Sequence, residues 1–229
     1  MIRLGTRRSA LATAQATQVA DALRALGHEV ELVQIVTTGD VNRAPLEQIG
    51  GTGIFVSALR DALLANEIDV AVHSLKDLPT ASVDGLTIGA VPVREDPRDV
   101  LVARDGLGLG ELQTGALVGT GSPRRVAQLE ALGLGLELTG IRGNVDTRIA
   151  MVTQGKLDAV VLARAGLARL GRLSEITETL DPIQVLPAPG EIAQEVVGGS
   201  QALLPGCPPG QRGRDRPTLR QLDGLAEEH

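Results

Sequence analysis

Short β-rich runs and helical periodicity alternate along the first half of the chain. Apolar residues recur every three or four positions from Leu11 to Leu26, as on one face of a helix, and Gly27 follows as a helix-ending residue. Runs of aliphatic and β-branched residues, such as Val30–Val36, are typical of strands. The pattern predicts, in order, a strand at 2–4, a helix at 11–26, a strand at 30–36, a helix at 55–65 and a strand at 69–73.

The second half of the chain repeats this alternation. Residues 116–120 form a strand-like run, and Ser122 followed by Pro123 is a strong helix start, because serine caps a helix and proline suits its first turn. A further helix is expected to begin near Asn144, and residues 159–162 form another apolar strand. Strands that alternate with helices in this way predict βαβ units and a largely parallel sheet.

Two pairs of short segments correspond between the halves. Leu4-Gly-Thr6 corresponds to Val118-Gly-Thr120, and Asp69-Val-Ala-Val72 corresponds to Asp158-Ala-Val-Val161. Because both pairs occur in the same order, we expect an α/β fold built from two similar lobes. Ligands of open α/β sheets bind beyond the carboxyl ends of the strands, so two such lobes would enclose a cleft between them.

Proline-rich segments mark the places where the chain is expected to cross between the lobes. They lie near residues 92–98 and 181–190, and each proline forces the residue before it into extended geometry. Glycine and proline are also dense after residue 190, which predicts a poorly ordered tail rather than a compact third domain. The expected parts are a first lobe at 1–95 with a return segment near 187–197, a second lobe at 98–182 and a tail at 191–229.

Composition and charge exclude several classes of partner. Hydrophobic residues make up 43% and charged residues 22% of the chain, as in an ordinary globular protein. The net charge is −6, and one Phe without Tyr or Trp leaves no aromatic platform for bases, so no nucleic-acid partner is expected. The sequence contains no apolar run of about 18 residues that could span a membrane. It also begins without a charged-then-apolar leader, which favours a cytoplasmic protein.

The cysteine count restricts covalent and metal chemistry. Cys207 is the only cysteine, which excludes an intramolecular disulfide and a cysteine-based metal cluster. We therefore expect no metal site.

Three predicted helix starts carry pairs of arginines. A helix N-terminus already bears partial positive charge, so each cation there costs roughly 0.3–1 kcal/mol unless an anion docks beside it. Guanidinium groups bind carboxylates and phosphates in bidentate fashion, and the absence of a phosphate-loop motif favours carboxylates. One interpretation is a shared polycarboxylate ligand; the other is that the arginines pair with acidic residues of the protein itself. The pairs are Arg7 and Arg8 before Ser9, Arg124 and Arg125 after Ser122, and Arg142 and Arg148 around Asn144.

Candidate acid–base residues follow the predicted strand at 69–73. Lys76 and Asp77 together could hold a proton donor near a substrate amine, although a solvated turn pair is an equally good interpretation. His73 beside Ser74 suggests a nucleophilic triad only weakly, because no G-x-S-x-G motif accompanies it, and a packed histidine is favoured. The glycines of residues 50–53 would suit a mobile lid, or simply a long connection.

Many ordered segments resemble the porphobilinogen deaminase (hydroxymethylbilane synthase) family over residues 1–190. They include Arg3-Leu-Gly-Thr-Arg-Arg-Ser9, Gly50-Gly-Thr-Gly-Ile-Phe-Val56, Val72-His-Ser-Leu-Lys-Asp-Leu-Pro79, Arg94-Glu-Asp-Pro-Arg-Asp99, Gly119-Thr-Gly-Ser-Pro-Arg-Arg125, Arg142-Gly-Asn-Val-Asp-Thr-Arg148 and Ala165-Gly-Leu-Ala-Arg-Leu-Gly171. The resemblance implies two periplasmic-binding-protein-like lobes. It also implies a monomeric cytoplasmic transferase that condenses porphobilinogen head to tail, with loss of ammonia, to hydroxymethylbilane.

The resemblance assigns roles to individual residues. It implies that Asp77 is the catalytic acid and that Phe55 lies on an active-site loop. It also implies a dipyrromethane cofactor held by a cysteine of a third domain. The residues implied to bind acetate and propionate carboxylates are Arg7, Ser9, Lys76, Thr120, Ser122, Arg124, Arg125, Arg142 and Arg148.

The chain departs from the family pattern in two places. Thr52 and Ser57 stand where family members often carry lysines. After Pro189-Gly190 the sequence no longer resembles the family, so the usual third α+β domain is expected to be absent or vestigial. Cys207 lies in Pro-Gly-Cys-Pro-Pro rather than in the family's Gly-Gly-Cys, and the attachment role is not transferred to it. A non-catalytic two-lobe binder of a small polycarboxylate and an inactive truncated fragment are the alternative functions.

Overall fold

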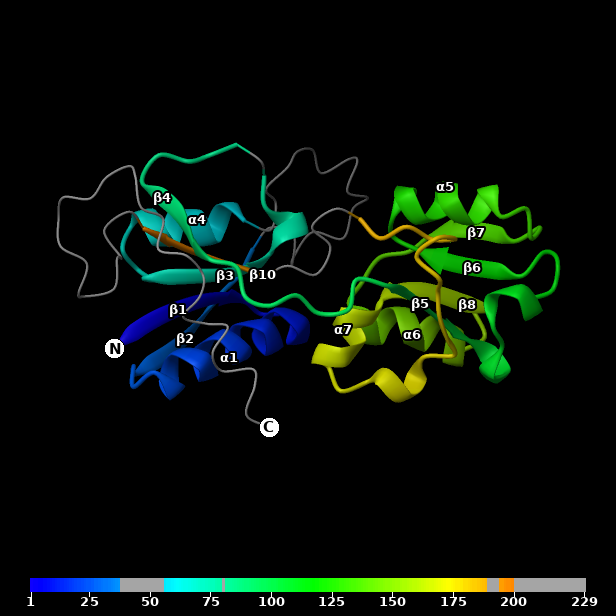
Figure 1. Cartoon of the computed structure of the whole chain (residues 1–229), viewed down its shortest axis with the longest axis horizontal. Helices are drawn as coiled ribbons and strands as arrows, with labels where there is room; N and C mark the ends of the chain where they lie inside the picture. Colours follow the sequence, from blue (N-terminus) through cyan, green and yellow to red (C-terminus); the bar gives the residue numbers. More distant parts are fainter. Residues whose placement is uncertain (38–55, 80, 189–193, 200–229) are drawn as a thin grey trace.

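The chain forms two α/β lobes side by side (Figure 1). The computed structural model describes residues 1–37, 56–79, 81–188 and 194–199. In them lie two five-stranded sheets, of strand order β2-β1-β3-β10-β4 and β7-β6-β8-β5-β9. The two-lobed α/β class predicted from the sequence is confirmed.

The first sheet takes its strands from the first part of the chain and from one late segment. Helix α1 begins where predicted, with Ser9 as its N-cap, and Gly27 follows its end with a φ of 87° that suits glycine. The elements are β1 (Ile2–Arg7), α1 (Ala10–Ala25), β2 (Val30–Ile35), α4 (Ser57–Leu64), β3 (Val70–Ser74), a 3-10 turn (Leu75–Asp77), β4 (Leu86–Ala90) and β10 (Gln194–Gly199).

The second sheet is built from the middle of the chain. Helices α5 and α6 begin at the predicted positions, with Ser122 and Asn144 as their N-caps. The elements are β5 (Asp99–Ala103), 3-10 turns at Arg104–Gly106 and Leu109–Glu111, β6 (Leu117–Thr120), α5 (Pro123–Ala131), β7 (Glu137–Gly140), α6 (Val145–Thr153), β8 (Ala159–Ala163), α7 (Arg164–Arg169), a 3-10 turn (Leu173–Glu175) and β9 (Glu178–Thr179).

Both described sheets are mixed: one strand of each, β10 or β5, runs against the other four, so the largely parallel arrangement predicted from the sequence holds except at that strand. Strand β1 is parallel to β2 and β3, whereas β10 is antiparallel to β3 and β4. Likewise β6 is parallel to β7 and β8, whereas β5 is antiparallel to β8 and β9. Strands β5 and β10 each follow a crossing from the other lobe, so they enter their sheet at the edge where the parallel strands end. Hydrophobic periodicity does not record this direction of entry.

The correspondence between the halves extends to individual contacts. The backbone N–H of Arg3 donates to Asp69, and that of Leu117 donates to Asp158, both at 2.7 Å. A Cβ atom on Gly5 would lie 2.3 Å from Ile68, and one on Gly119 would lie 2.6 Å from Leu157. The two lobes therefore repeat one packing scheme around β1 and β6, as the two matching segment pairs predicted.

Residues 194–199 correct the interpretation of the C-terminal part as a tail. They form β10 between β3 and β4, with Val197 buried in the first lobe's core. This strand overlaps the predicted return segment near 187–197. Gly198 and Gly199 favour a loop locally, but the β-branched pair that precedes them suits a strand once the sheet is present. Residues 200–229 lie outside the described part of the chain.

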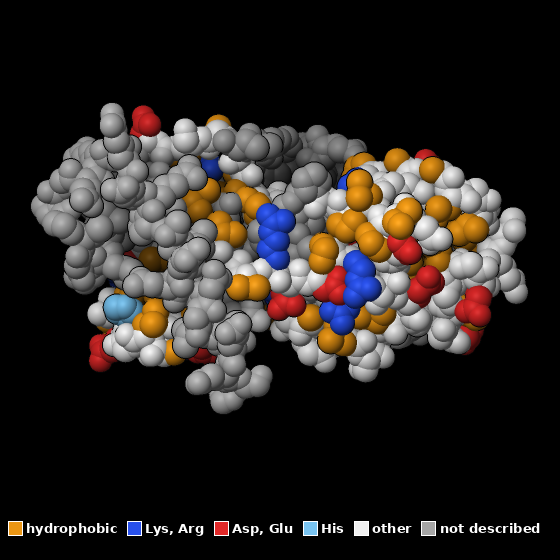
Figure 2. Space-filling view, viewed as in Figure 1, with side chains coloured by type: hydrophobic (Ala, Val, Ile, Leu, Met, Phe, Trp, Pro, Cys, Tyr) orange, Lys and Arg blue, Asp and Glu red, His pale blue; other side chains and the backbone are white. Residues whose placement is uncertain are grey.

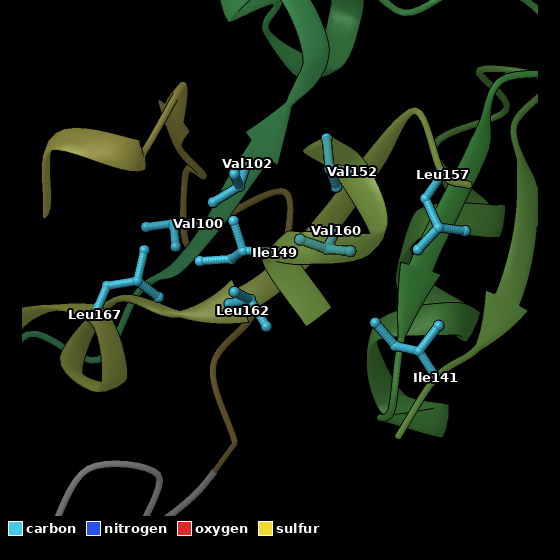
Figure 3. Packing of buried hydrophobic residues seen from close by; sticks show 9 residues of the cluster. All are labelled: Val100, Val102, Ile141, Ile149, Val152, Leu157, Val160, Leu162 and Leu167. Atoms are coloured by element: carbon cyan, nitrogen blue, oxygen red, sulfur yellow. The ribbon is translucent and has the colours of Figure 1, made fainter. Parts of the chain in front are cut away.

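Alternating side chains of the second sheet build two hydrophobic clusters. Val100, Val102, Val160 and Leu162 point to one face, where they pack with Ile149 and Leu167 (Figure 3). Their neighbours Leu101, Ala103, Ala159 and Val161 point to the other face and pack with residues such as Leu129. Strands β5 and β8 are thus buried on both faces, which explains their unbroken aliphatic sequences.

Two segments carry the chain between the lobes (Figure 1). One joins β4 to β5, and the other returns from β9 towards β10. Asp96 in the first crossing accepts hydrogen bonds from Arg98 at 2.6 to 3.1 Å and lies 3.4 Å from Arg164, so this end of the crossing is attached to the second lobe. Among the described residues, no helix is both long and apolar enough to cross a membrane.

Candidate functional site

The carboxyl ends of the parallel strands of both sheets lie towards the boundary between the lobes. Helices α1 and α7 are in contact, and each begins within a few residues of the end of a parallel strand, β1 and β8. A Cβ atom on Gly166, near the start of α7, would lie 3.9 Å from Leu11, near the start of α1. Lysine and arginine side chains are visible where the lobes meet (Figure 2).

In the first lobe, the structure brings together Arg7 at the end of β1 and Asp77 in the turn after β3. Nη1 of Arg7 lies 3.8 Å from Oδ2 of Asp77, and both side chains are partly buried. Burial raises the pKa of Asp77, and the positive charges of Lys76 and Arg7 oppose this rise. Asp77 is therefore a carboxyl group that holds its proton more tightly than an exposed aspartate does.

Ser9 and Lys76 flank this pair with different exposures. The hydroxyl of Ser9 accepts the backbone N–H of Ala12 at 3.2 Å and so caps α1. Lys76 is exposed on the turn that carries Asp77. Ser9 thus follows Arg7 closely in sequence and serves as a helix cap, whereas Lys76 directly precedes Asp77 and is an exposed cation.

His73 is a packed core residue rather than part of a nucleophilic triad. It is 5% exposed on β3, and burial together with the charges of Arg7 and Arg60 lowers its pKa to about 4. Its neighbour Ser74 is hydrogen-bonded to Gln15, whose amide donates to the serine hydroxyl at 3.0 Å. The structure therefore favours the interpretation of a packed histidine.

The buried neutral state of His73 predicts a loss of stability in acid. In the unfolded chain the imidazole takes up a proton near pH 6.5, whereas in the folded chain it does so only near pH 4. The contribution is complete above about pH 6.5 and is lost progressively as the pH falls to about 4, by about 3 kcal/mol in total. Urea unfolding of His73→Gln across this range should show a flatter dependence on pH than the parent chain. His28→Gln is the control, and equal slopes for all three proteins would contradict the prediction.

In the second lobe, Thr120 and Ser122 form the turn between β6 and α5. The hydroxyl of Thr120 accepts the backbone N–H of Ser122 at 3.3 Å, and Thr120 is only 1% exposed. Ser122 occupies the N-cap position of α5, as predicted, but its side chain makes no capping hydrogen bond. The turn is therefore ordered by Thr120.

Arg124 and Arg125 share one buried carboxylate, that of Asp99. Arg125 donates through Nη2 to Oδ1 at 2.6 Å and through Nε to Oδ2 at 2.9 Å, and Arg124 donates through Nη2 to Oδ2 at 3.0 Å. Nη1 of Arg124 also donates to the carbonyl of Leu186. At the start of α5, therefore, a carboxylate of the protein itself offsets part of the positive charge of the arginines. Pairing with acidic residues of the protein was one of the two interpretations left open by the sequence.

Arg142 and Arg148 differ from that pair. Nη1 of Arg142 is buried without a hydrogen-bond partner, and among the described residues neither arginine has a carboxylate partner. Nε of Arg148 donates to the carbonyl of Gly143 at 2.9 Å. Burial lowers the pKa of Arg148, and the positive charges of Arg125 and Arg142 lower it further, so these three cations repel one another. The start of α6 thus carries concentrated positive charge that an anionic ligand would offset.

Gly121 allows this arrangement because it has no side chain. A Cβ atom there would lie 2.8 Å from the carbonyl oxygen of Ile141 and 3.4 Å from Nη2 of Arg148. The guanidinium of Arg148 is therefore stacked closely against the turn between β6 and α5. Any larger residue at position 121 must displace the backbone carbonyl of Ile141 or the turn itself.

We expect Gly121→Ala to destabilise the protein by about 1–3 kcal/mol, because the added methyl group overpacks against a backbone carbonyl. Gly140→Ala is a matched control at the end of β7, where a Cβ atom would meet nothing within 4 Å. That variant should change the free energy of unfolding by less than about 1 kcal/mol, in the stabilising direction. Denaturant unfolding of the two variants tests the difference, and equal stability would show that the turn relaxes freely.

The structure thus groups the predicted residues by lobe and leaves two of them outside its described range. Phe55 and Cys207 lie outside the described residues, as do the glycines of residues 50–53. Asp99 was not predicted as a partner of the arginines, although it lies in the Arg94–Asp99 motif. Among the described residues, no group of three or more His, Cys, Asp or Glu side chains is placed to hold a metal ion.

Solved structures of low sequence identity share the fold. A periplasmic substrate-binding protein of an ABC transporter from Coxiella burnetii has a TM-score of 0.53 and 14% identity, over 88% of this chain and 86% of that one. A methionine-binding lipoprotein, described as putative, from Bacillus subtilis has a TM-score of 0.50 and 12% identity, over 87% and 83% of the two chains. The expected likeness to periplasmic-binding-protein lobes is confirmed.

Curated relatives are much closer in sequence. A porphobilinogen deaminase of Mycobacteroides abscessus is 61% identical over 202 residues, and one of Mycobacterium tuberculosis is 59% identical over 206 residues. These alignments cover 88% and 89% of this chain but 66% of each relative, so the chain spans just under two thirds of their length. The family described as "Porphobilinogen deaminase, dipyromethane cofactor binding domain" matches residues 2–200. The chain belongs to the porphobilinogen deaminase family.

Proposed function

We propose that this chain supplies the two substrate-binding lobes of a hydroxymethylbilane synthase. The first lobe spans 1–95 with the return segment near 187–197, and the second spans 98–182. Of the tail at 191–229, strand β10 is assigned to the first lobe. The enzyme joins porphobilinogen units head to tail and releases ammonia. The identity of 61% to a porphobilinogen deaminase supports the reaction, and the separate strand composition of the two sheets supports the boundaries.

One observation carries the proposal: the concentrated positive charge at Arg142 and Arg148. A buried guanidinium nitrogen without a partner is costly unless a ligand satisfies it. Porphobilinogen bears an acetate and a propionate side chain, and carboxylates match guanidinium groups in bidentate geometry. We assign these two arginines to the carboxylates of the growing chain, with Arg124, Arg125, Thr120 and Ser122 completing the second-lobe side and Arg7, Ser9 and Lys76 the first-lobe side.

The same residues suit the family's dipyrromethane cofactor, which also carries carboxylate side chains. When bound, this cofactor supplies the anchored end from which the chain of pyrroles grows. The unpartnered nitrogen of Arg142 and the neighbouring Arg148 would hold its carboxylates. The attachment point is not assigned, because Cys207 lies in a Pro-Gly-Cys-Pro-Pro sequence unlike that of the family.

Asp77 is placed to move the protons of the reaction. Each condensation forms a carbon–carbon bond between pyrrole units, breaks the bond to the aminomethyl nitrogen and releases that nitrogen as ammonia. The ring carbon loses one proton as the ammonia takes one away, so a single carboxyl group can recover what it donates. The burial that raises the pKa of Asp77 helps it to hold a proton, and Arg7 at 3.8 Å steadies the carboxylate after donation.

The proposal includes a monomer in the cytoplasm, with neither nucleic acid nor membrane as partner. A net charge of −6 supports the absence of a polyanionic partner.

Calorimetric titration of the purified chain with porphobilinogen tests the proposal. Arg142→Gln should weaken binding by about 10–100-fold, because hydrogen bonds between charged groups are worth roughly 1.5–3 kcal/mol. Arg24→Gln, which removes an exposed pair with Asp21, and Cys207→Ser should leave the affinity unchanged. Ammonia release in the same samples separates a deaminase from a non-catalytic binder. An unchanged affinity of Arg142→Gln for porphobilinogen would contradict the proposed site.

A further inference from the structure

Asp99 lies at the site edge of the second sheet although it belongs to none of the helix starts. It is the first residue of β5 and stands opposite Ala163, the last residue of β8. Because β5 runs antiparallel to β8, its first residue meets the carboxyl end of the parallel strands. The crossing from the first lobe thus delivers a carboxylate to the edge that carries the arginines.

The contacts of Asp99 fix both arginines of α5. Its two oxygens accept three hydrogen bonds from Arg124 and Arg125 at 2.6 to 3.0 Å, and Asp99 is fully buried. The paired bonds to Nε and Nη2 set the plane of the Arg125 guanidinium, since a bidentate contact leaves little freedom of rotation. The third bond, together with the Leu186 carbonyl, holds Arg124 from two sides.

The carboxylate also supplies the charge that this edge needs. Arg125 is near enough to Arg148 for its charge to lower the pKa of Arg148, so the cations at this edge repel one another. A negative charge between Arg124 and Arg125 offsets part of that repulsion, and it does so from the core side, where the residue is inaccessible to solvent. The arginines can then be held in place without a ligand.

We infer that Asp99 is a positioning residue for ligand binding: it does not contact the ligand but holds Arg124 and Arg125 in the orientation that binds carboxylates. This inference rests on the proposed function. Arginine side chains that are already held in one orientation lose less conformational entropy when a ligand binds, and Asp99 provides that restraint.

The test uses the whole chain with Asp99→Asn, and Asp99→Glu as a second variant that keeps the charge. Asp158→Asn is the matched control, since Asp158 pairs with Arg104 in the same lobe at the opposite edge of the sheet. The first readout is hydrogen exchange of the Arg125 Nε–H by ¹⁵N NMR, assigned with Arg125→Lys. The second is the Kd for porphobilinogen, measured at a temperature where circular dichroism shows each variant folded, so that global stability does not enter.

We expect Asp99→Asn to speed exchange of the Arg125 Nε–H at least about tenfold and to raise the Kd by about 10–100-fold, because small displacements of binding groups carry large penalties. Asp99→Glu should fall between the parent and Asp99→Asn, and it decides the question if the asparagine variant does not fold. Asp158→Asn should change neither readout. A folded Asp99 variant with unchanged exchange or unchanged Kd would overturn the inference. If the parent chain does not bind porphobilinogen, the proposed function fails, while the exchange measurement still decides whether Asp99 positions the arginines.

Discussion

Replacing Asp77 by asparagine is expected to slow the release of ammonia from porphobilinogen by about 10²–10⁴-fold, the usual contribution of a positioned acid–base group. Asparagine has nearly the same shape as aspartate but cannot donate and recover a proton. Its amide also avoids the cost of burying a carboxylate, so the folded state should not suffer. The affinity for porphobilinogen should change much less than the rate, since the carboxylates are assigned to arginines.

Single-turnover ammonia release and calorimetric binding together separate these effects. Asp61→Asn, on the exposed side of α4 in the same lobe, serves as the control for removing one negative charge. A variant that binds porphobilinogen as the parent does but releases ammonia slowly would support the role of Asp77. Equal rates for Asp77→Asn and Asp61→Asn would exclude Asp77 as the acid.

The elements that sequence analysis located share strong local signals. Helices α1, α5 and α6 each follow a serine or asparagine N-cap, and α5 adds a proline in its first turn. These features act over a few residues, so the helix starts that they predict do not depend on contacts distant in sequence. The duplicated Gly-Thr and Asp segments were equally informative, because their glycines and their aspartates make the same close contacts in each lobe.

The missed elements depend on contacts distant in sequence. Strand β5 was not predicted, although all its residues are buried, because its partner β8 lies about sixty residues later and their direction follows from the crossing. Strand β10 falls within both the expected return segment near 187–197 and the expected tail from 191, because its glycines lie in a glycine-rich context that hides the strand. In both cases the sheet, rather than local propensity, determines the conformation.

The site shows the same division. The arginines were found because several cations at helix starts conflict with the helix dipole, which is a local conflict visible in sequence. Asp99 was missed because nothing in its neighbourhood indicates that the carboxylate is buried or that it reaches Arg124 and Arg125. The raised pKa of Asp77 likewise arises from burial in the folded lobe and cannot be inferred from a lysine–aspartate pair alone.

Removing the Asp99 carboxylate should also cost more stability than removing any exposed ion pair of the chain. Asp99→Ala removes the buried carboxylate to which Arg125, whose side chain is 6% exposed, donates two hydrogen bonds, and breaking a buried pair in this way costs about 3–5 kcal/mol. The matched comparison is Asp69→Ala, which removes a pair with Arg3 of nearly equal length, 2.7 Å against 2.6 Å, but with both side chains about one-third exposed. Solvent screens that pair, so its ionic contribution should be about 0–1 kcal/mol.

A double variant distinguishes the cost of breaking the buried ion pair from the cost of a cavity. In Asp99→Leu/Arg125→Met, both partners are replaced by apolar side chains, and buried pairs exchanged in this way often lose no stability. Arg124, with 28% of its side chain exposed and a second bond to the Leu186 carbonyl, remains solvated. Urea unfolding should therefore show a large loss for Asp99→Ala and recovery to within about 1–2 kcal/mol of the parent in the double variant. A double variant as unstable as Asp99→Ala would mean that packing around β5, not the broken ion pair, accounts for the loss.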